Sequence, residues 1–578
     1  MPNIFINNKE YEVAENFTVL DAVKQAGGYI PTLCYLDLKG INIENKPASC
    51  RVCVVEIEGR RNLAPACATP VFEGMKVFTH SRKAIQARRT VIQLLLSNHP
   101  KDCLNCAKNL DCDLQTMSAE LNITSNPYSG RQNRIDKDIS AAIIRDPSKC
   151  VMCRKCETMC NTFQTVGVLS AVERGFESVV EPTFNLGLED TACTFCGQCV
   201  AVCPTGALVE RDYIEEVWNE IEHPKKHVVV QTAPAVRVAL AEEFGYAPGT
   251  ISTKKLAGAL KVLGFDSVFD TNFAADLTIM EEASEFIDRF TNGGYMPMLT
   301  SCCPGWVKFL EHQFSDLIEM PSTAKSPQQM FGAIAKTYYA EKINVDPKDM
   351  TVVSIMPCLA KKYEAAREEL NSNPEYKDVD YVLTTRELAK MIKEAGFNFD
   401  SIPEAEYDSP LGASTGAATI FGRTGGVAEA ALRTAYEWIT KEELKEVEFE
   451  ALRGYEGVRI AEVDIKGTKV RIGVAFGLGN VRKLLEDIRL KKVDVHLIEV
   501  MACPGGCVGG GGQPYHHGDL NIIKKRIEAL NTDDRNCEIR KSHENPAIIK
   551  LYEDYLGKPN SEKSHHLLHT HYLAREWM

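Results

Sequence analysis

The sequence lacks the features that mark membrane, secreted and nucleic-acid-binding proteins. No uninterrupted apolar run reaches the roughly 18 residues that a membrane-spanning helix needs. The first residues, MPNIFINNKEYEVAEN, alternate and carry charge, which is unlike a signal peptide. Acidic residues outnumber basic ones, and the net charge of −13 argues against the clustered positive surface that nucleic acid requires. We therefore expect a cytoplasmic protein that binds neither membranes nor nucleic acid.

What the chain has in excess is cysteine. Its 578 residues, 44% hydrophobic and 25% charged, have the composition of an ordinary globular protein, and the length suggests about four domains. Twenty-one cysteines would suggest disulfides in a secreted chain, but without an export signal their tight C-x2-C spacings favour metal ligands. The ligand sets described below account for nineteen of them. Cys302 and Cys537 remain.

Three cysteine sites in the second half of the chain stand in similar settings. The first is MACPGGCVGGGG at 501–512, where glycines would let backbone approach a bulky group beside Cys503 and Cys507. The others are TSCCPGW at 300–306, with Cys302 and Cys303, and MPCLAKKYE at 356–364, with Cys358. Each follows an apolar run. Soft thiolates brought together in this way select iron–sulfur chemistry, zinc or copper(I).

These three motifs, in this order, resemble the signatures of the iron-only, or [FeFe], hydrogenases. The resemblance implies that Cys303, Cys358, Cys503 and Cys507 hold a [4Fe–4S] cluster. It also implies that Cys507 bridges this cluster to a two-iron unit carrying CO, cyanide and a small dithiolate, which completes the H-cluster. The activity implied is the reversible reaction H2 ⇌ 2 H+ + 2 e−.

Residues 1–80 show the pattern of a β-grasp domain. A hairpin is expected over 2–13, turning at Asn7 and Asn8, and Thr18 with Asp21 forms a capping-box pattern before a helix that Gly27 would end. The cysteine spacing C-x15-C-x2-C-x13-C departs from that of plant ferredoxins. It resembles the [2Fe–2S] domain of respiratory complex I and hydrogenase large subunits, with zinc as the alternative. The ligands implied are Cys34, Cys50, Cys53 and Cys67.

Residues 81–125 would form a second cluster domain. An amphipathic helix is expected over 81–98, and it leads directly into His99, Cys103, Cys106 and Cys112. The arrangement H-x3-C-x2-C-x5-C resembles the His-and-three-Cys [4Fe–4S] site of the same enzymes. Replacing one thiolate by neutral imidazole should raise the reduction potential, as histidine ligands do in Rieske centres.

Residues 126–215 carry two runs of C-x2-C-x2-C-x3-C, the pattern of a two-cluster ferredoxin. In that pattern the fourth cysteine of each run ligates the cluster of the other run. Pro204 follows the second run, whereas Asn161 replaces proline after the first. The two predicted [4Fe–4S] ligand sets are Cys150, Cys153, Cys156 and Cys203 for one cluster, and Cys160, Cys193, Cys196 and Cys199 for the other.

Residues 216–578 alternate short apolar strands with amphipathic helices, which predicts parallel sheets covered by helices. Strands are expected at 227–231, 266–270, 295–301, 351–356, 380–385, 471–476 and 495–500, and helices at 253–264, 386–396 and 481–490. The three cysteine sites follow strands, as ligands do at the carboxyl ends of open α/β sheets. The family resemblance implies two lobes that close on the cluster.

The sequence thus predicts a multidomain protein of α+β and α/β class. The domains expected are a β-grasp [2Fe–2S] domain (1–80), a His/Cys3 [4Fe–4S] domain (81–125), a two-cluster ferredoxin-like domain (126–215) and a two-lobed α/β hydrogenase domain with parallel sheets (216–578). The cofactors expected are one [2Fe–2S] cluster, three [4Fe–4S] clusters and the H-cluster.

The family resemblance also assigns residues around the two-iron unit. Lys361 would bond a cyanide, although a lysine at the start of a helix is ordinarily solvated. Met356 and Met501 would pack against the cluster, which is compatible with a plain core role. Ala235 lacks the hydroxyl that some relatives have at its position. The remaining lining positions implied are Pro234, Phe421 and Gly422.

A proton path is implied from Cys302 through Glu282, Ser322 and Glu285, with Arg289 near its end. Cys302 is not needed as a ligand, because Cys303 serves. Glu282 and Glu285 are three residues apart on an expected helix and share a face. Such faces usually meet solvent, but buried carboxylates would have raised pKa values suited to relaying protons near neutral pH.

No convincing nucleotide site is visible. Gly477 and Gly479 follow a strand, but Arg482 occupies the third glycine position of the dinucleotide fingerprint. NAD(P) chemistry would therefore belong to a flavin-containing iron–sulfur partner subunit, and MACPGGC looks closer to electron-bifurcating complexes than to solitary ferredoxin-dependent enzymes. The histidine-rich segment 564–572 could bind a metal or simply pack.

Several alternatives remain open at this stage. The first 210 or so residues also resemble the electron-transfer segments of complex I and formate dehydrogenase, although molybdenum enzymes would not explain the three later cysteine motifs. A stand-alone ferredoxin-dependent hydrogenase, a sensory hydrogenase and a hydrogenase-like iron–sulfur assembly factor share the catalytic pattern. Assembly factors usually lack the intact CCPGW and the Met–Lys setting, both of which this chain keeps.

Overall fold

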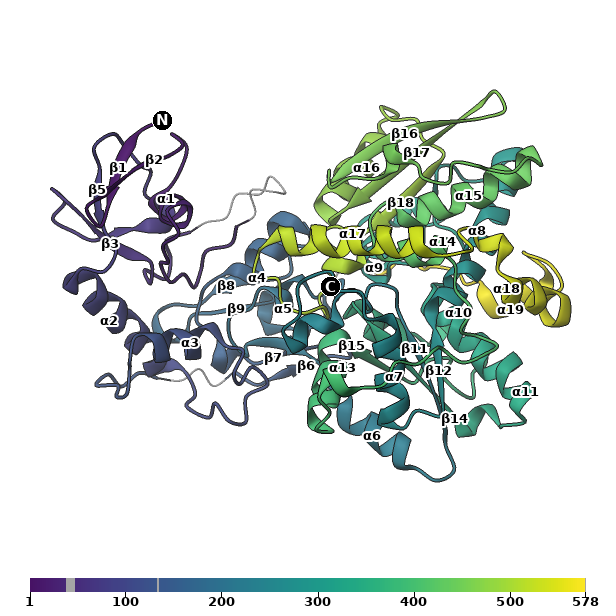
Figure 1. Cartoon of the computed structure of the whole chain (residues 1–578), viewed down its shortest axis with the longest axis horizontal. Helices are drawn as coiled ribbons and strands as arrows, with labels where there is room; N and C mark the ends of the chain where they lie inside the picture. The colour runs from purple at the N-terminus through teal and green to yellow at the C-terminus, as the bar shows by residue number, and fades with distance from the viewer. Residues whose placement is uncertain (38–46, 132–134, 577–578) are drawn as a thin grey trace.

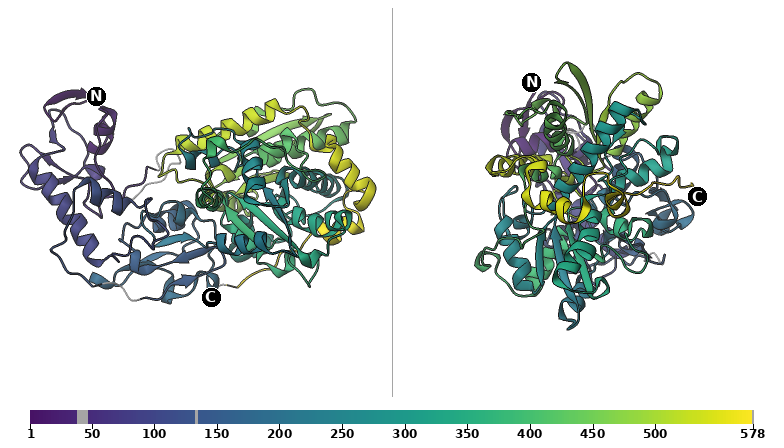
Figure 2. Two further views of the ribbon diagram at one scale, coloured as in Figure 1. Left: turned by 60° about the horizontal axis from the view of Figure 1, so that its bottom comes forward. Right: turned by 90° about the vertical axis from the view of Figure 1, so that its right-hand side faces the viewer.

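The computed structural model describes residues 1–37, 47–131 and 135–576. The molecule is elongated, with the amino-terminal residues at one end and the two four-stranded sheets at the other (Figures 1 and 2). Between them lies a small region built of short strands and helices. Within the described ranges, no helix is both long enough and apolar enough to cross a membrane.

The amino-terminal unit is a β-grasp fold. A hairpin of β1 (Asn3–Ile6) and β2 (Lys9–Glu12) turns at Asn7 and Asn8, which both have positive φ as a type I′ turn requires. Helix α1 (Val19–Gln25) starts with the predicted capping box. The sheet order is β2-β1-β5-β3-β4, with β5 (Lys76–Phe78) parallel to β1; β3 spans Val54–Ile57 and β4 spans Ala64–Pro65. The hairpin and the helix start are therefore confirmed.

Two helices and two small sheets connect this unit to the rest of the chain. Helix α2 (Arg82–Asn98) is capped by Ser81, and α3 (Asp113–Glu120) follows Cys112. The ferredoxin-like part pairs β6, β7 and β10 in the order β10-β7-β6, and β8 with β9. Its elements are β6 (Asp138–Ile139), β7 (Ile143–Arg145), α4 (Lys155–Thr158), β8 (Ser170–Val172), β9 (Val179–Glu181), α5 (Gln198–Ala201) and β10 (Leu208–Glu210).

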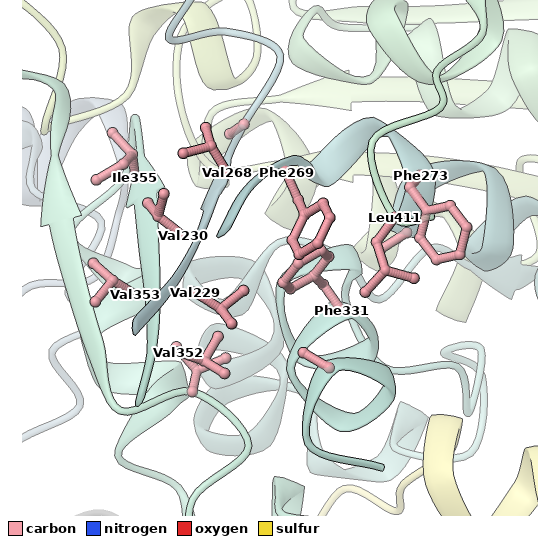
Figure 3. Close-up of a cluster of buried hydrophobic side chains, with 14 of the residues drawn as sticks. Val229, Val230, Val268, Phe269, Phe273, Phe331, Val352, Val353, Ile355 and Leu411 are labelled. Carbon is pink, nitrogen blue, oxygen red and sulfur yellow. The ribbon is translucent and has the colours of Figure 1, made fainter. Parts of the chain in front are cut away.

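The first large lobe is built on a four-stranded, wholly parallel sheet. Its order is β12-β11-β14-β15, and its strands are buried over nearly their whole length, as parallel strands covered on both faces must be. Figure 3 shows valines of β11, β12 and β14 beside Phe269, whose ring lies against that of Phe331. The elements are α6 (Ile214–Glu222), β11 (His227–Thr232), α7 (Thr253–Leu263), β12 (Ser267–Asp270), α10 (Pro327–Ile334), β14 (Met350–Met356), α12 (Ala360–Ala365), β15 (Tyr381–Thr384) and α13 (Thr385–Glu394).

The second lobe corrects one sequence-based expectation. Its sheet has the order β13-β18-β17-β16, and β13, β18 and β17 are parallel, but β16 is antiparallel to β17. The sheet is therefore mixed, and the strand expected at 295–301 is only the two residues of β13. The elements are β13 (Met298–Leu299), α9 (Pro304–Gln313), α14 (Gly416–Thr419), α15 (Gly426–Thr440), β16 (Val458–Ile465), β17 (Thr468–Phe476), α16 (Leu478–Arg489), β18 (Leu497–Met501) and α17 (Leu520–Asn536).

Helix α8 (Thr271–Asn292) joins the two lobes. One side of α8 packs into the core of the first lobe through Phe273 and Leu277, and another side packs into the core of the second through Ile279 and Phe286. Two shorter helices near the carboxyl end, α18 (Pro546–Leu551) and α19 (Glu562–Leu568), complete the first core. A helix buried between two cores explains why Asp276, Glu281, Glu282 and Glu285 are not on the surface.

Candidate metal centre

A cavity of about 740 Å³ lies where strands from both lobes end. The segments that follow β11 and β14 enclose it from the first lobe, and those that follow β13 and β18 enclose it from the second. This position at the carboxyl ends of parallel strands is the usual ligand site of open α/β sheets. The cavity brings together twelve of the predicted residues: Pro234, Ala235, Cys302, Cys303, Met356, Cys358, Lys361, Phe421, Gly422, Met501, Cys503 and Cys507.

Four thiols of this cavity form a single group. Cys303 is the residue before α9, Cys358 follows β14, and Cys503 follows β18. A hydrogen bond from Cys503 lowers the pKa of Cys358, whereas burial, followed by the charge of Cys358, raises the pKa of Cys303 to about 11. Cys507 is close enough to both Cys303 and Cys358 for their charges to raise its own pKa, after burial. Buried thiols this close are costly to ionise unless a metal shares the charge.

The glycines around Cys507 allow the backbone of this loop to pack closely against neighbouring segments. Gly505 and Gly506 both have positive φ, and a Cβ on Gly506 would lie 2.6 Å from the backbone nitrogen of Thr424. A Cβ on Gly511 would lie 2.6 Å from the Cα atom of Gly197 in the ferredoxin-like part. Neither contact has room for a side chain, so the loop packs directly against both neighbours.

Lys361 is buried rather than solvated. Its ammonium donates to Glu364 Oε2 at 2.9 Å and to the carbonyl of Cys302 at 3.0 Å. Burial alone would lower the pKa of Lys361, but the Glu364 carboxylate holds it above its ordinary value. A charged donor is therefore fixed at the cavity wall, directly beside Cys302.

The residues predicted for a proton path lie behind the cavity on α8 and the segment after β13. Glu282 is 1% exposed, and Ser301 donates to its Oε1 at 3.4 Å. Burial, reinforced by the charge of Glu285, raises the pKa of Glu282 to about 8. Ser322 donates to Glu285 Oε2 at 2.6 Å, and Arg289 donates to Glu285 Oε1 at 2.5 Å.

Cys302 completes this series on the cavity side. Burial raises the pKa of its thiol well above the ordinary value, and the nearby charge of Glu282 raises it further. The thiol is therefore protonated, which suits a proton donor. Arg289 is partly exposed, so the series runs from the cavity toward the surface.

Two smaller cavities in the ferredoxin-like part divide its eight cysteines into two groups of four. One cavity, of about 410 Å³, is lined by Cys150, Cys153, Cys156 and Cys203. The other, of about 430 Å³, is lined by Cys160, Cys193, Cys196 and Cys199. The fourth cysteine of each run thus lies with the first three of the other run, which is the arrangement that two-cluster ferredoxins require.

The cysteines of the β-grasp unit form two close pairs. Cys53 and Cys67 have their Sγ atoms 3.3 Å apart. A hydrogen bond from Cys50, opposed in part by burial, lowers the pKa of Cys34 to about 5.

His99 follows α2 with its Nδ1 buried and without a hydrogen-bond partner among the described residues. Burial, assisted by the charge of Lys149, lowers the pKa of His99 to about 4, so the ring is neutral and able to ligate a metal. Cys103 is exposed, and Cys106 and Cys112 are partly buried.

Contacts between the ferredoxin-like part and the cavity loop were not predicted from the sequence. Gln198 donates to the carbonyl of Gly509 at 3.0 Å, and Gln164 donates to the carbonyl of Ala502 at 2.8 Å. The Cys503 thiol lies 4.0 Å from the carbonyl oxygen of Cys196. Both glutamines are buried. The only signal in the sequence that could have indicated these contacts is that each glutamine lies within or just after a cysteine motif.

The glycines of the incomplete dinucleotide fingerprint have a packing role. A Cβ on Gly477 would lie 2.8 Å from the ring of Phe163, and one on Gly479 would lie 2.7 Å from the Phe163 carbonyl. Arg482 donates to Thr165, so the whole segment is docked on the ferredoxin-like part.

Of the histidines near the carboxyl end, only His569 is buried, whereas His565, His566 and His571 are exposed. His569 is 8% exposed, and it bonds Glu281 at 3.1 Å through Nε2 and Thr323 at 2.8 Å through Nδ1.

Sequence models of known protein families match five segments of the chain. Residues 226–511 match the carboxyl-terminal domain of the iron-only hydrogenase large subunit, and residues 520–575 match the iron hydrogenase small subunit. The remaining matches are a 2Fe-2S iron-sulfur cluster binding domain (2–82), the NADH-ubiquinone oxidoreductase-G iron-sulfur binding region (88–127) and a 4Fe-4S dicluster domain (149–207).

Full-length relatives decide the family. The chain is 60% identical to the NADP-reducing hydrogenase subunit HndD of Solidesulfovibrio fructosivorans, over 100% of this chain and 99% of that protein. It is 38% identical to iron hydrogenase 1 of Clostridium pasteurianum, over 99% of this chain and 100% of the relative. The chain belongs to the iron-only hydrogenases.

A solved structure agrees with this assignment. The apo [FeFe]-hydrogenase HydA1 of Chlamydomonas reinhardtii superposes with a TM-score of 0.57 at 44% identity, covering 63% of this chain and 99% of that one. This hydrogenase is therefore an oxidoreductase that oxidises and produces H2, with iron–sulfur domains that relay the electrons. The predictions of family, fold class and enzymatic activity are confirmed.

Proposed function

We propose that Cys303, Cys358, Cys503 and Cys507 hold the [4Fe–4S] part of the H-cluster, with Cys507 also bridging to the two-iron unit. The support is the meeting of four thiols from three distant segments in one large cavity. An all-thiolate donor set suits an iron–sulfur cluster. When bound, the H-cluster supplies the iron chemistry that splits or forms H2, and the protein supplies orientation and electrostatics.

The residues around the rest of the cavity would fix the two-iron unit. Lys361, held by Glu364, is positioned to donate to a cyanide nitrogen. Met356 and Met501 close two sides of the cavity. Ala235 offers no hydroxyl, so the hydrogen bond that some relatives make there is missing. The other contacts would be apolar or backbone contacts from Pro234, Phe421 and Gly422.

Protons would move through Cys302, Glu282, Ser322 and Glu285, and leave near Arg289. The Cys302 thiol faces the cavity and is protonated, so it can give a proton to the site and recover one from Glu282. Ser322 and Glu285 are already hydrogen-bonded to each other. A carboxyl group with a pKa of about 8 can both give and take protons near neutral pH.

Electrons would move through four further clusters in chain order. The β-grasp domain (1–80) would hold one [2Fe–2S] cluster at Cys34, Cys50, Cys53 and Cys67. The next domain (81–125) would hold a [4Fe–4S] cluster at His99, Cys103, Cys106 and Cys112. The ferredoxin-like domain (126–215) would hold two more, of which the one at Cys160, Cys193, Cys196 and Cys199 lies beside the hydrogenase domain (216–578).

We further infer that this hydrogenase works in a hetero-oligomer with a flavin-containing subunit that carries the NADP(H) chemistry, and that the complex also exchanges electrons with ferredoxin by bifurcation. The single observation behind this proposal is the 60% identity, over nearly the whole of both chains, to a protein named as a subunit of an NADP-reducing hydrogenase. A cytoplasmic location suits its 21 free cysteines, because thiols and their clusters persist in a reducing compartment.

Purification of the native protein under anaerobic conditions tests this proposal. We expect a flavoprotein to co-purify, and H2-dependent NADP+ reduction to require both that flavoprotein and ferredoxin. A monomer that reduces ferredoxin at full rate with no flavoprotein attached would instead show a stand-alone enzyme, like the second candidate suggested by the likeness to iron hydrogenase 1.

A further inference from the structure

Lys308 is a buried cation without a carboxylate partner. It lies on α9, five residues after Cys303, and is 3% exposed. Within residues 1–37, 47–131 and 135–576 its ammonium forms neither an ion pair nor a hydrogen bond. Burying an ammonium group in this way costs several kcal/mol unless some other charge compensates it. Other lysines buried to the same degree are paired: Lys325 with Asp378, Lys336 with Asp380 and Lys362 with Glu387.

The nearest carboxylate on α9 is already neutralised. Glu311, one turn further along, accepts from Arg367 at 2.6 Å and from Arg575 at 2.8 Å. Both arginines also pair with Glu369. This group of two arginines and two glutamates has no net charge, and it leaves no anion for Lys308.

Two aromatic rings hold the Lys308 ammonium in place. Its Nζ lies 4.5 Å from the ring centroid of Phe195 and 4.6 Å from that of Tyr363. The two rings are stacked with their centroids 5.0 Å apart. Cation–π contacts compensate for part of the hydration that the ammonium group loses on burial. They also fix the position of the charge.

The remaining group near Lys308 that can carry negative charge, once it holds a metal, is the cysteine group of the adjacent cavity. Phe195 lies between Cys193 and Cys196 in the sequence, and both cysteines line that cavity. Burial lowers the pKa of Lys308 to about 8, and among the charged neighbours that oppose this effect Cys193 acts most strongly. A [4Fe–4S] cluster held by four thiolates is itself anionic and gains one further negative charge on reduction. Net charge is one of the factors that set its potential.

We propose that Lys308 is the buried counter-cation of the [4Fe–4S] cluster at Cys160, Cys193, Cys196 and Cys199, and that it raises the reduction potential of this cluster. The inference rests on the ligand set assigned under the proposed function. Lys308 acts on electron transfer through the cluster and touches no reacting atom. Its charge favours the reduced state of the cluster that lies next to the H-cluster, so electrons leaving H2 have a stable first acceptor.

The test is a redox titration of the full chain, followed by electron paramagnetic resonance, in wild type and in two variants. In Lys308→Met the reduction potential of this cluster should fall by at least about 59 mV. This corresponds to a tenfold change in the equilibrium constant of a one-electron reduction. Lys308→Arg keeps the charge, and a guanidinium group can also face the two aromatic rings, so the potential of the cluster should stay near that of wild type. The titration signal of this cluster is identified as the one that Cys160→Ser alters.

Lys325→Met is the matched control, because it removes an equally buried lysine that faces Asp378. It should leave every cluster potential unchanged. If Lys308→Met assembles poorly, Lys308→Gln removes the charge while keeping a polar end, and the same shift is expected. An unshifted titration signal in the neutral variants, or an equal shift in Lys308→Arg, would overturn the inference. Absence of the Cys160-dependent titration signal from wild type would instead contradict the ligand set.

Discussion

At the scale of single residues, burial decides the chemistry of the site. Glu282 and Lys361 lie on helices whose charged faces would ordinarily meet solvent, yet the structure buries both beside one cavity or directly behind it, and the partly buried Cys302 lines the same cavity. Burial keeps Cys302 and Glu282 protonated and leaves Lys361 charged because Glu364 pairs with it. Proton donors and a fixed cation are thereby placed around the same space.

Replacing the cavity thiol tests the proton path at its first residue. In Cys302→Ala we expect all clusters to assemble and H2 evolution to fall by at least about 100-fold, the scale of a lost general acid. The measurement is H2 evolution per assembled H-cluster, with cluster content checked by spectroscopy. Cys537→Ala is the control, since its thiol donates only to the carbonyl of Asp533 among described residues. Wild-type turnover by Cys302→Ala would refute the assignment.

The protonation state of Glu282 gives a pH-dependent signal. Its pKa rises from 4.5 to about 8 in the folded protein, so between these values the folded chain binds a proton that the unfolded chain releases. The stability contributed by this proton is complete below pH 4.5 and is lost as pH rises through 8, at up to about 1.4 kcal/mol per pH unit.

Infrared difference spectra should therefore show a protonated carboxyl band at pH 7 that disappears through about pH 8. Glu282→Gln should remove this band. A second band should remain in the variant, because burial also raises the pKa of Asp276 to about 7. A spectrum at pH 7 that is identical in wild type and Glu282→Gln would contradict a protonated Glu282.

At the scale of elements, the site depends on loops that pack too closely for side chains. The glycine-rich loop after β18 and the Cys196–Cys199 segment meet at Gly511 and Gly197, and Gln198 bonds the same loop. Docking of this kind sets the distance between the two cysteine groups on either side. Electron transfer to the H-cluster therefore depends on contacts that no metal ligand makes.

A methyl group added at Gly511 should slow electron transfer while leaving the chemistry of H2 at the H-cluster intact. In Gly511→Ala the new Cβ would lie 2.6 Å from Gly197 Cα, so the loops must move apart. We expect H2-dependent reduction of an acceptor to fall roughly ten- to hundredfold, because small misplacements near a reaction path are costly. Exchange between H2 and D2O, which needs only the H-cluster and proton path, should persist.

Gly396→Ala serves as the control for general destabilisation, since at φ +75° the new side chain strains the backbone while its Cβ meets nothing within 4 Å. It should affect neither assay. Equal losses of both activities in Gly511→Ala would mean that the H-cluster site itself is damaged, against a role in docking.

Much of the fold could be predicted from local patterns. The strands β11, β14 and β18 are short apolar runs, and the capping box of α1 is a local signal. The antiparallel strand β16 was missed although its residues alternate between exposed and buried, the period of an edge strand. The burial of α8 could not be predicted, because its charged residues give no sign that a second lobe covers them.

The metal site, like the fold, could be predicted from the sequence only in part. Cysteine spacing and family resemblance gave the ligand candidates, since those signals are local in sequence. The contacts of Gln164 and Gln198, and that of Lys308 with Phe195, arise only when residues more than a hundred positions apart meet. Their partners are backbone carbonyls and aromatic rings, which carry no distinctive sequence signal.

At the scale of the whole molecule, the domains proposed to carry electrons lie in a row that ends at the hydrogenase domain. The β-grasp unit lies at one end of the elongated molecule, the ferredoxin-like part lies in the middle, and the two lobes enclose the cavity at the other end (Figure 2). Sequence order and spatial order coincide. Electrons and protons would reach the cavity from different sides, the electrons past Cys196 and the protons past Glu285.

Infrared spectroscopy of the chain after assembly with its H-cluster tests the central claim most directly. Iron-bound CO and cyanide give sharp bands in a region free of protein absorption. The account predicts these bands in wild type, a shift of the cyanide bands in Lys361→Met, and loss of all bands in Cys503→Ala. Wild-type protein that shows no such bands after maturation, with zinc in place of iron at the four thiols, would contradict it.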